Sequence, residues 1–581
     1  MCRTVRRRTW RTGDIDGNVL GQRRGDAPLT SSTATPSTAT LASGRQLLDV
    51  LVCGALAAAA AWLVLLVAPA GGDLAAHVYR TELVRHGILV WDNFWFAGDY
   101  PLSSYSLLYY PLAAVVGNTA LAIAGVVVAA SFFASVVPRE WPTAGRLPAL
   151  AFAVLLAGQV FTAAYPFDLG LAMLMVTLWA LQRGRRWLAL PAMLATLGFS
   201  PLAFLFLALA LLAVALRGRR LNRTTLLLAT AVAAAGGAQL GLLVLLPTPA
   251  LVFPYGIWRM LAGLVVAGLG AWLSLRGRAG WPLASLFLVW AVAGVAFEVV
   301  PSPVGRNILR ASVFVFPLML VAAARAGWRP RWLALTACAV ALASNVLPYT
   351  AMIPDRSSSR GSKLSFWQPV IHFLDRHEPP RFRVEVVETA NHWENYFLPE
   401  AGFPLARGWY VQLDIADNRA LYAPGLTAAR YTAWLRARAV RYVVLPHLPD
   451  EKTYGGREAA LLGSGHSGLR EVWSDSHASI YELPHATPLL TGRAPATVTL
   501  FGASRIAGRV TRPGVYLLRV AFNPYWKVER GSLCLSRAGD GATLLHARRA
   551  GRFAIKAIEA PGRLLAAITG GTSSAECPEG K

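Results

Sequence analysis

Charged residues are scarce in this sequence, and lysine is scarcer still. Only 15% of the 581 residues are charged, whereas 55% are hydrophobic, and such a composition is too apolar for an ordinary soluble protein. The 56 basic residues include only five lysines. We attribute this bias toward Arg to a GC-rich genome, such as that of an actinobacterium. The composition indicates that lipid is the main solvent of the chain.

Cysteine is also rare, and its distribution argues against a structural zinc site. The five cysteines form no CxxC pair and no Cys/His cluster, and such clusters are what zinc sites require. Cys53 and Cys338 fall in apolar segments. Cys534 and Cys577 fall in a region that we expect outside the cytoplasm, where a disulfide is possible. Because they are far apart in sequence, whether they pair stays open at this stage.

Acidic residues are too few to balance the basic ones, and the formal net charge is +25. A nucleic-acid-binding protein would carry its basic residues on a soluble face with aromatic residues between them. Here Arg residues instead form short clusters between apolar runs, at 183–186, 217–223, 276–280 and 325–331. This pattern is typical of cytoplasmic loops in a membrane protein. We therefore interpret the charge as a signal of topology and expect no nucleic-acid partner.

Residues 46–350 are predicted to form a transmembrane domain of about eleven helices, after a disordered, basic cytoplasmic tail at 1–45. Apolar runs lie at 47–68, 104–137, 147–164, 167–182, 187–216, 224–246, 256–275, 281–300, 307–324 and 332–350. If every Arg cluster is cytoplasmic, 187–216 crosses twice, as two short helices broken at 198–201. By the same parity, 104–137 crosses once, after an interfacial or re-entrant helix. Residues 69–103 then form the first extracytoplasmic loop.

The chain after residue 350 has the composition of an extracytoplasmic, soluble domain. Residues 351–487 are predicted to be an α/β region, and residues 488–581 a β-sandwich-like region. In the first region we expect helices at 366–377 and 427–439 and strands at 382–388 and 441–446. In the second we expect strands at 496–501, 514–522, 525–531, 553–560 and 563–569. The fold class is thus a polytopic α-helical membrane protein with a C-terminal α/β plus β-sandwich domain.

The stretch GGDLAAHVYRTELVRHGILVWDNFWFAGDYP, residues 71–101, concentrates ionisable and aromatic groups after the first apolar run. If residues 73–86 are helical, Asp73, His77 and Arg80 lie on one face. Such a set suits group transfer from a phosphate-linked donor. The carboxylate takes a proton from an acceptor hydroxyl or holds a divalent cation, while Arg offsets phosphate charge and His77 assists. The alternative is that Asp73 caps a surface helix and Arg80 is solvated.

Other residues of this loop are candidates for substrate binding. Asp99 adds a further carboxylate. Trp91 and Trp95 form either a stacking platform for a sugar ring or an interfacial aromatic belt.

Polar groups also occur at the predicted outer ends of several spans, namely Asp168, Glu298, Arg306, Arg310, Asn345 and Tyr349. Charges inside lipid are costly and usually line a cavity or pathway. Because these groups lie at one side only, they favour an outward-facing cavity over a channel. Arg306 and Arg310 are the best candidates to bind a lipid phosphate. For Glu298 with Arg310, a structural ion pair is an equal alternative.

The sequence resembles the GT-C superfamily of membrane glycosyltransferases in three features. Its first loop places Asp73 just after the first span, in the stretch GGDLAAHVYRTELVRHGILVWDNFWFAGDYPLSSYSLLYYPL. Many spans follow this loop, and the chain ends in an exported domain. The resemblance covers residues 47 to about 350. It implies a polyprenyl-phosphate-linked sugar donor and makes Asp73 the catalytic or metal-binding carboxylate, with Mg or Mn as the possible ion. The loop lacks a tight Asp-x-Asp pair, however, so the need for a metal stays open.

In detail the chain is similar to actinobacterial membrane proteins labelled 6-pyruvoyl-tetrahydropterin synthase-related, a label that implies no pterin chemistry here. The similarity includes RVEVVETANHWENYF at 383–397, LARGWYVQLD at 405–414 and NPYWKVERG at 523–531. Within these stretches His392 and Arg407 could bind an acceptor glycan. The alternative is that they belong to the core of the domain.

These observations predict a multi-pass enzyme of the plasma membrane that transfers a sugar from a polyprenyl phosphate to an envelope glycan, lipid or protein on the outer face. A transporter or flippase is an alternative class, although the sequence shows no paired halves of the kind many transporters have. A noncatalytic scaffold for envelope assembly is the other alternative.

Overall fold

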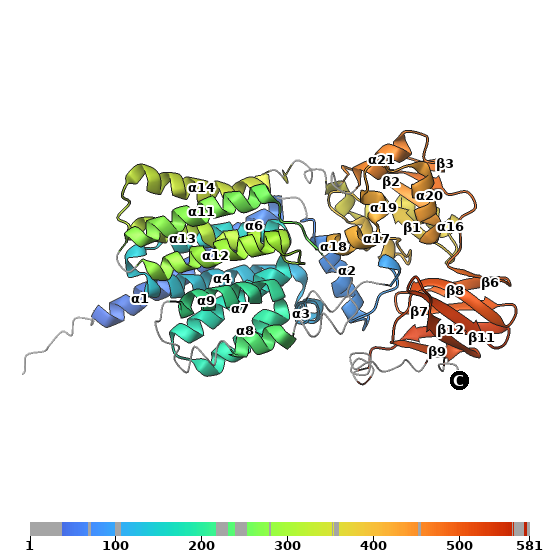
Figure 1. The fold of residues 1–581 in the computed structure, drawn as a ribbon, viewed down its shortest axis with the longest axis horizontal. Helices are drawn as coiled ribbons and strands as arrows, with labels where there is room; N and C mark the ends of the chain where they lie inside the picture. The colour runs from blue at the N-terminus through green and yellow to red at the C-terminus, as the bar shows by residue number, and fades with distance from the viewer. Residues whose placement is uncertain are drawn as a thin grey trace, which may run out of the picture. The chain divides into compact units, whose positions relative to one another are not determined.

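A computed structural model describes most of the chain (Figure 1). The described residues are 38–67, 71–98, 106–216, 230–238, 252–277, 280–350, 352–353, 359–450, 455–560, 562 and 575–577. The predicted tail therefore lies outside the described residues up to position 37, and Asp99, the strand expected at 563–569 and most of the span expected at 224–246 also lie outside them. Residues 46–581 form one compact unit.

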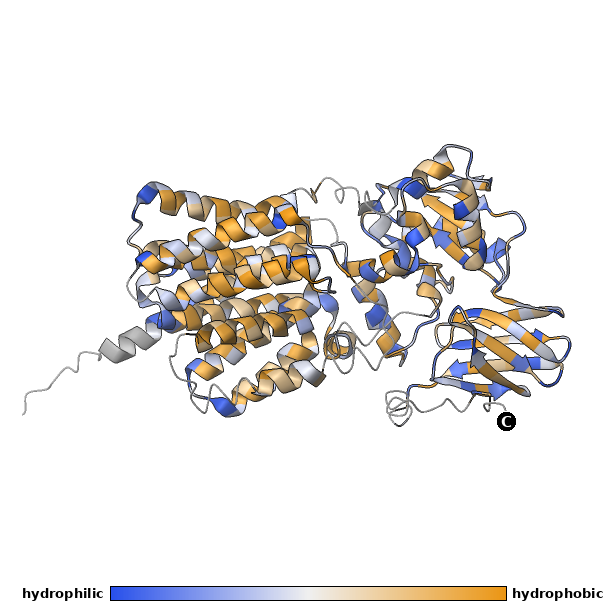
Figure 2. Cartoon of the chain, in the orientation of Figure 1, coloured by the Kyte–Doolittle hydropathy of each residue, from blue (hydrophilic) through white to orange (hydrophobic). Residues whose placement is uncertain are grey.

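The first half is a bundle of mostly apolar helices (Figure 2). Six described helical stretches are long and apolar enough to cross a membrane, which indicates a membrane protein; the eleven crossings expected from sequence stay a prediction. The six stretches are Gly44–Val67, Asn118–Glu140, Ile257–Arg276, Trp281–Val299, Gly305–Arg325 and Arg331–Thr350. The helices of this half are α1 (Thr38–Val67), α2 (Leu74–Arg85), α3 (Tyr109–Val116), α4 (Asn118–Glu140), α5 (Leu147–Leu155), α6 (Ala157–Phe161), α7 (Tyr165–Gln182), α8 (Arg186–Phe199), α9 (Pro201–Ala215), α11 (Ile257–Arg276), α12 (Trp281–Val299), the 3-10 helix η4 (Gly305–Phe314), α13 (Val315–Arg325) and α14 (Arg331–Thr350).

Two breaks expected from sequence are present in the bundle. Gly117 separates α3 from α4 at a φ of 93°, a conformation that favours glycine. Ser200 ends α8 and begins α9, and its side chain accepts a hydrogen bond from the backbone N–H of Ala203. A Ser cap followed by Pro201 is a typical helix start.

Small residues allow the bundle helices to approach closely. Helix α4 packs on α7, and α7 packs on α8. A side chain added at Gly170 would come within 2.7 Å of the Ser200 Cβ, and one added at Gly125 within 3.3 Å of the Asp168 backbone. Such contacts are typical of helix packing in membranes, where small residues let backbones meet.

The α/β region contains one four-stranded sheet, in the order β1-β2-β4-β3, with β1 and β2 parallel and the other pairs antiparallel. The helices and strands expected at 366–377, 382–388, 427–439 and 441–446 are all present. The elements are η5 (Ser359–Ser362), α16 (Leu364–His377), β1 (Arg383–Val386), α17 (Glu394–Glu400), α18 (Val411–Asp417), α19 (Arg419–Tyr422), α20 (Ala428–Ala437), β2 (Val440–Pro446), α21 (Gly456–Gly463), β3 (Arg470–Ser474) and β4 (Ala478–Glu482).

The C-terminal region contains two four-stranded sheets, in the orders β10-β11-β8-β5 and β6-β7-β12-β9, which share one hydrophobic core. The strands are β5 (Leu490–Gly492), β6 (Ala496–Phe501), β7 (Arg505–Val510), β8 (Gly514–Ala521), β9 (Trp526–Arg530), β10 (Leu533–Arg537), β11 (Ala542–Ala547) and β12 (Gly551–Ala557). Cys534 and Cys577 form a disulfide, so the pairing that sequence left open is made.

The segment 71–98 packs into both C-terminal cores. Tyr79 and Trp95 belong to the core beneath the α/β sheet, whereas Trp91 and Phe94 belong to the core of the two-sheet region. The backbone N–H groups of Leu89 and Trp91 donate to the Glu559 carboxylate. This segment is therefore an ordered connector rather than a free surface loop.

Candidate active site

Asp73 occupies the start of α2, where groups from three parts of the chain meet. It stands at the N-cap position, but its carboxylate makes no capping hydrogen bond. Instead, Trp409 donates from Nε1 to Oδ1 at 3.2 Å, and Arg310 of η4 places a guanidinium nitrogen 3.6 Å from Oδ2. The Asp73 side chain is 34% exposed and that of Arg310 is 24% exposed. The capping alternative therefore does not account for this carboxylate, which stays accessible.

Behind Asp73, one turn along α2, lies a buried chain of hydrogen bonds. His77 is buried; its Nδ1 lies 3.1 Å from the Tyr110 hydroxyl, and it also bonds the backbone of Ala163. The Arg80 guanidinium donates to the same Tyr110 oxygen at 2.9 Å. Burial lowers the pKa of His77 to about 4, with the nearby charge of Arg80 acting in the same direction. His77 is therefore neutral at pH 7, and its Nδ1 shares a hydrogen bond with the Tyr110 hydroxyl.

This burial changes the roles expected for His77 and Arg80. The predicted helix and its shared face are present, but both side chains are 4% exposed or less, so neither contacts a substrate directly. Instead, both side chains contact the Tyr110 hydroxyl, behind Asp73 along α2. The assignment of Arg80 as a substrate-binding residue is thus corrected to a positioning residue.

The polar groups at the helix ends do not all gather at Asp73. Arg310 does, and its guanidinium also lies 5.8 Å from the centre of the Phe167 ring. Arg306 lies over the Phe253 ring at 4.4 Å. The Glu298 carboxylate accepts from the backbone N–H of Gly256 at 2.9 Å, just before α11. The expected ion pair between Glu298 and Arg310 is therefore wrong, because each residue has a different partner.

Trp91 and Trp95 are buried, which corrects both interpretations of these aromatic residues. Trp95 is 0% exposed, lies 4.6 Å from Tyr79 between ring centres and donates to the Asn395 carbonyl. Trp91 packs beside Trp526 in the core of the two-sheet region. With their faces covered by protein, neither ring is a sugar platform nor part of an interfacial belt. They attach the segment 71–98 to the C-terminal half.

Arg407 lies in the core of the α/β region, which agrees with the alternative to an acceptor site. It is 3% exposed and lies within ion-pair distance of four carboxylates, those of Glu385, Glu388, Asp414 and Glu458. Burial raises the pKa values of Glu385, Glu388 and Glu458, while Arg407 opposes that rise. The cluster is a buried polar network that fixes β1 against α18 and α21.

His392 supports the site indirectly. It is buried, and its ring stacks on the Trp409 ring with 3.3 Å between centres and 12° between planes. The Glu394 carboxylate lies 3.7 Å from its Nδ1. Since Trp409 donates to Asp73, His392 holds the donor in place. The assignment of His392 to acceptor binding is corrected to this positioning role.

The groups around Asp73 do not fit a divalent metal ion. An indole N–H and a guanidinium donate toward the carboxylate, whereas a metal would need further oxygen or imidazole ligands there. Among the residues that the structure describes, no cluster of three or more His, Cys, Asp or Glu side chains is placed to hold an ion. We therefore assign no chemical step to a metal.

No protein-family model matches this chain, and a search of curated proteins finds no match either. The function must consequently be argued from the site itself.

Sequence reasoning missed Tyr110, and it named Trp409 and Asp168 without bringing them to Asp73. Trp409 lies in a stretch that was singled out, but its contact with Asp73 spans more than three hundred positions. Tyr110 sits in an apolar run that gave no polar signal. Asp168, at the start of α7, is 0% exposed, and neither carboxylate oxygen has a hydrogen-bond partner; Arg310 acts on it electrostatically.

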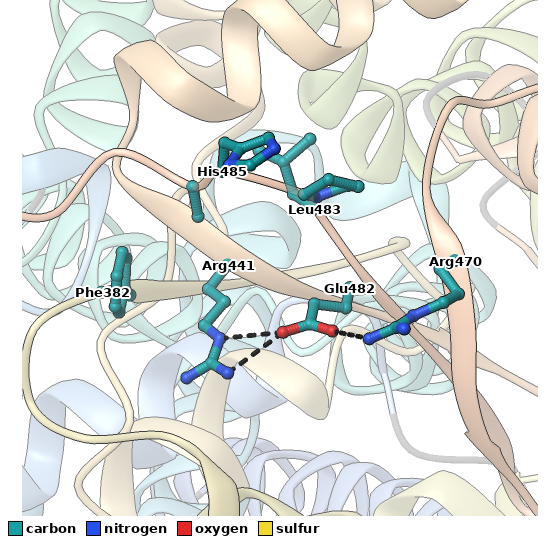
Figure 3. Close-up of a pocket in the computed structure, with 8 residues that line it drawn as sticks. Phe382, Arg441, Arg470, Glu482, Leu483 and His485 are labelled. Carbon is teal, nitrogen blue, oxygen red and sulfur yellow. Dashed lines mark hydrogen bonds and ion pairs between the residues drawn. The ribbon is translucent and has the colours of Figure 1, made fainter.

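Two pockets are lined by residues of the soluble half, the second together with Val252 of the helical half, and Asp73 lines neither of them. One, of about 380 Å³, is lined by Phe382, Arg441, Arg470, Glu482, Leu483, Pro484, His485 and Ala486. There Arg441 and Arg470 donate to Glu482 from opposite sides, as Figure 3 shows. The other, of about 370 Å³, is lined by Val252, Gln412, Ile415, Ala416, Arg419, Tyr422 and Ala423. This second pocket lies along α18, which begins two residues after Trp409.

Proposed function

We propose that the protein is an integral membrane glycosyltransferase that moves a sugar from a polyprenyl-phosphate carrier to an envelope acceptor on the outer face of the plasma membrane. The observation that carries this proposal is the meeting of Asp73, Arg310 and Trp409. A partly exposed carboxylate, a guanidinium at the end of a membrane helix and an aromatic ring from the soluble half meet at one point. These are the groups that a base, a lipid phosphate and a sugar would require.

The reaction is a single displacement at the anomeric carbon of the donor sugar. Asp73 takes the proton of the acceptor hydroxyl as its oxygen forms a bond to that carbon. The bond between the anomeric carbon and the phosphate oxygen breaks, and its electron pair leaves with the polyprenyl phosphate. The anomeric configuration inverts. One base is sufficient, which agrees with the absence of a second carboxylate beside Asp73 in the sequence.

Arg310 is the group that offsets the charge of the leaving phosphate. At 3.6 Å its nitrogen is beyond ordinary hydrogen-bond distance from Asp73, so the guanidinium is not committed to that carboxylate and can turn to a phosphate. The buried charge of Arg80 adds positive potential from the other side. Both effects are strongest in the transition state, where negative charge on the phosphate is growing.

The orientation of the site supports an extracytoplasmic reaction. The Arg clusters between helices favour a cytoplasmic location for the opposite ends of the bundle. Asp73, after the first span, and Arg310, early in the stretch Gly305–Arg325, then face outward together. The proposal includes eleven crossings and an outward C-terminal half.

The test is an Asp73→Asn variant in proteoliposomes supplied with a labelled sugar on a synthetic polyprenyl phosphate and an envelope fraction as acceptor. We expect transfer to fall by roughly 10²–10⁴-fold, the usual effect of losing a general base, with an unchanged melting temperature. The matched control is Glu82→Gln, on the same helix and paired, among the residues that the structure describes, with Arg85 alone; it should keep wild-type transfer.

Undiminished transfer by Asp73→Asn would exclude this mechanism. Carrier movement across the bilayer without sugar transfer, measured in the same vesicles, would instead assign the protein to the transporter class.

A further inference from the structure

The two C-terminal regions differ sharply in charge. Residues 359–487 contain fourteen Lys or Arg and fourteen Asp or Glu, whereas residues 488–560 contain twelve basic and only three acidic residues. The Arg-rich composition of the chain therefore does not explain the second region, because the first has the same background and is balanced. The positive charge belongs to the two-sheet region specifically.

Six of these basic residues lie on one face of the sheet β6-β7-β12-β9. The register places Arg509 opposite Arg552 and Arg505 opposite Lys556, and Lys556 in turn lies opposite Lys527. Arg530 lies opposite Ala554. Since residues directly opposite each other in antiparallel strands share a face, the six cations project to the same side. They are Arg505, Arg509, Lys527, Arg530, Arg552 and Lys556.

This face is the outer side of the sheet. All six basic residues are exposed, while the alternate positions Ile506, Val510 and Ile555 lie in the shared core. Arg505 pairs with Glu529 at 2.7 Å. Among the residues that the structure describes, the other five cations make no ion pair. The outer face of this sheet, defined by these six residues, is called the cationic face below.

Like charges directly opposite each other in a sheet destabilise it. Arg509 with Arg552, and the row Arg505, Lys556 and Lys527, repeat this unfavourable arrangement across three strands. Core packing does not require these opposed like-charged pairs, because Thr or Gln would be equally suitable at exposed strand positions. An arrangement that costs stability in the free protein is expected where an anionic ligand relieves the repulsion on binding.

The composition of the cationic face decides between classes of ligand. Its other paired positions are Thr497, Leu500, Ala507 and Ala554, so it offers no aromatic ring for stacking on a nucleic-acid base. Leu500 is its one exposed large apolar residue among those positions, which is too little for insertion into a bilayer. What remains is an array of six cations, with the Glu529 carboxylate beside Arg505, on neighbouring strands about 4.8 Å apart. Such an array matches a polymer with repeated negative charges.

We propose that the cationic face binds an acidic polysaccharide of the cell envelope, recognised through repeated carboxylate or phosphate groups. The face would hold a charged glycan beside the membrane domain through several weak ion pairs and without a deep pocket. Binding is then strongly dependent on salt. The choice of an envelope glycan rests on the outward orientation proposed above, but the binding itself does not require transferase activity.

The experiment measures binding of polygalacturonate to the full chain in phosphatidylcholine nanodiscs, with neutral dextran as the uncharged polymer. Two variants remove charge from the face, Arg509→Gln with Arg552→Gln, and Lys527→Gln with Lys556→Gln. The control is Arg548→Gln with Arg549→Gln, an exposed pair just before β12 that lies outside the face. We expect each face variant to weaken binding roughly tenfold and the control less than about twofold.

A second measurement separates recognition from folding. Because removing opposed like charges relieves repulsion, the face variants should melt at the same temperature as the wild type or higher, while a structural role would lower their melting temperature. Equal weakening by the control, or no binding of polygalacturonate at low salt, would overturn the proposal. So would binding of phosphatidylglycerol vesicles by the full chain in nanodiscs in place of the polymer, since that result would assign the face to the membrane surface.

Discussion

Two arginines illustrate how residues of one type take opposite roles. Arg310 is partly exposed and meets a single carboxylate at 3.6 Å, so it can exchange partners. Arg407 is buried among four carboxylates, and its Nε donates to Glu385 at 2.7 Å. Removing water from Arg407 would lower its pKa, but the four carboxylates outweigh this and raise it. Arg310 can therefore bind a ligand, whereas Arg407 stabilises the fold.

We predict that Arg407→Met destabilises the fold. Losing the cation leaves four buried carboxylates facing each other, so we expect a destabilisation of roughly 3–5 kcal/mol near pH 7. The raised pKa values of Glu385, Glu388 and Glu458 mean that the folded state holds protons that the unfolded state releases. Stability should therefore fall as pH rises above the ordinary Glu range. The loss should be smaller at pH 5 than at pH 8, because a larger share of these groups is protonated at the lower pH.

Thermal unfolding of the purified protein in detergent at pH 5 and pH 8 checks this prediction. Arg430→Met, an exposed Arg on α20 with no ion pair among the described residues, is the control and should behave as wild type at both values. A variant at position 407 that stays as stable as this control at pH 8 would contradict the assignment of Arg407 to the core.

At the scale of elements, the segment 71–98 and the stretch 407–410 determine where Asp73 lies. Trp95 packs directly against Gly408, because a Cβ added at that glycine would lie 2.5 Å from the Trp95 ring. The next residue is Trp409, which donates to Asp73. The packing of segment 71–98 on the soluble half and the position of the Trp409 donor therefore both depend on the close approach of Trp95 to Gly408.

We predict that Gly408→Ala disturbs both the docking and the site. The added methyl group must displace Trp95 or the backbone before Trp409, at a cost of roughly 1–3 kcal/mol, as is usual for overpacking. Melting temperature and the initial rate of sugar transfer should both fall. Gly456→Ala, where nothing lies within 4 Å, is the matched control. Wild-type values for both quantities at position 408 would show that this contact does not position Trp409.

For the whole molecule, the property that decides the proposed function is whether the C-terminal half lies in the cytoplasm or outside it. The bundle has six helices that could cross a membrane, and the C-terminal half carries the disulfide Cys534–Cys577. Disulfides persist mainly in oxidising compartments. Cys53 and Cys338 are free and buried in the bundle.

We therefore predict that intact cells expose Cys534 and Cys577 to an impermeant maleimide only after an impermeant reductant has been added. The double variant Cys534→Ser with Cys577→Ser should lose this labelling. Labelling that appears only after lysis would place the C-terminal half in the cytoplasm, and the proposed reaction on the outer face would then be excluded.

The sequence by itself was sufficient for a helix break within 104–137 and another at 198–201, for helix α2 and for most strands of the soluble half, because periodicity, caps and turn residues act locally. It also singled out Asp73 and Arg310. It could not decide between a core and a binding site at His392 and Arg407, and it did not foresee the burial of Trp91 and Trp95, because an aromatic or charged residue has the same local pattern in both settings.

Only the tertiary structure decided which of these residues meet. Trp409 reaches Asp73 across more than three hundred positions, and the opposed cations of the cationic face share a side only through strand register. Hydropathy and local spacing carry no information about such contacts, because they arise when distant segments bury their apolar surfaces together and bring polar groups with them. The composition thus indicated a membrane environment for much of the chain, whereas tertiary packing determined which residues form the candidate site.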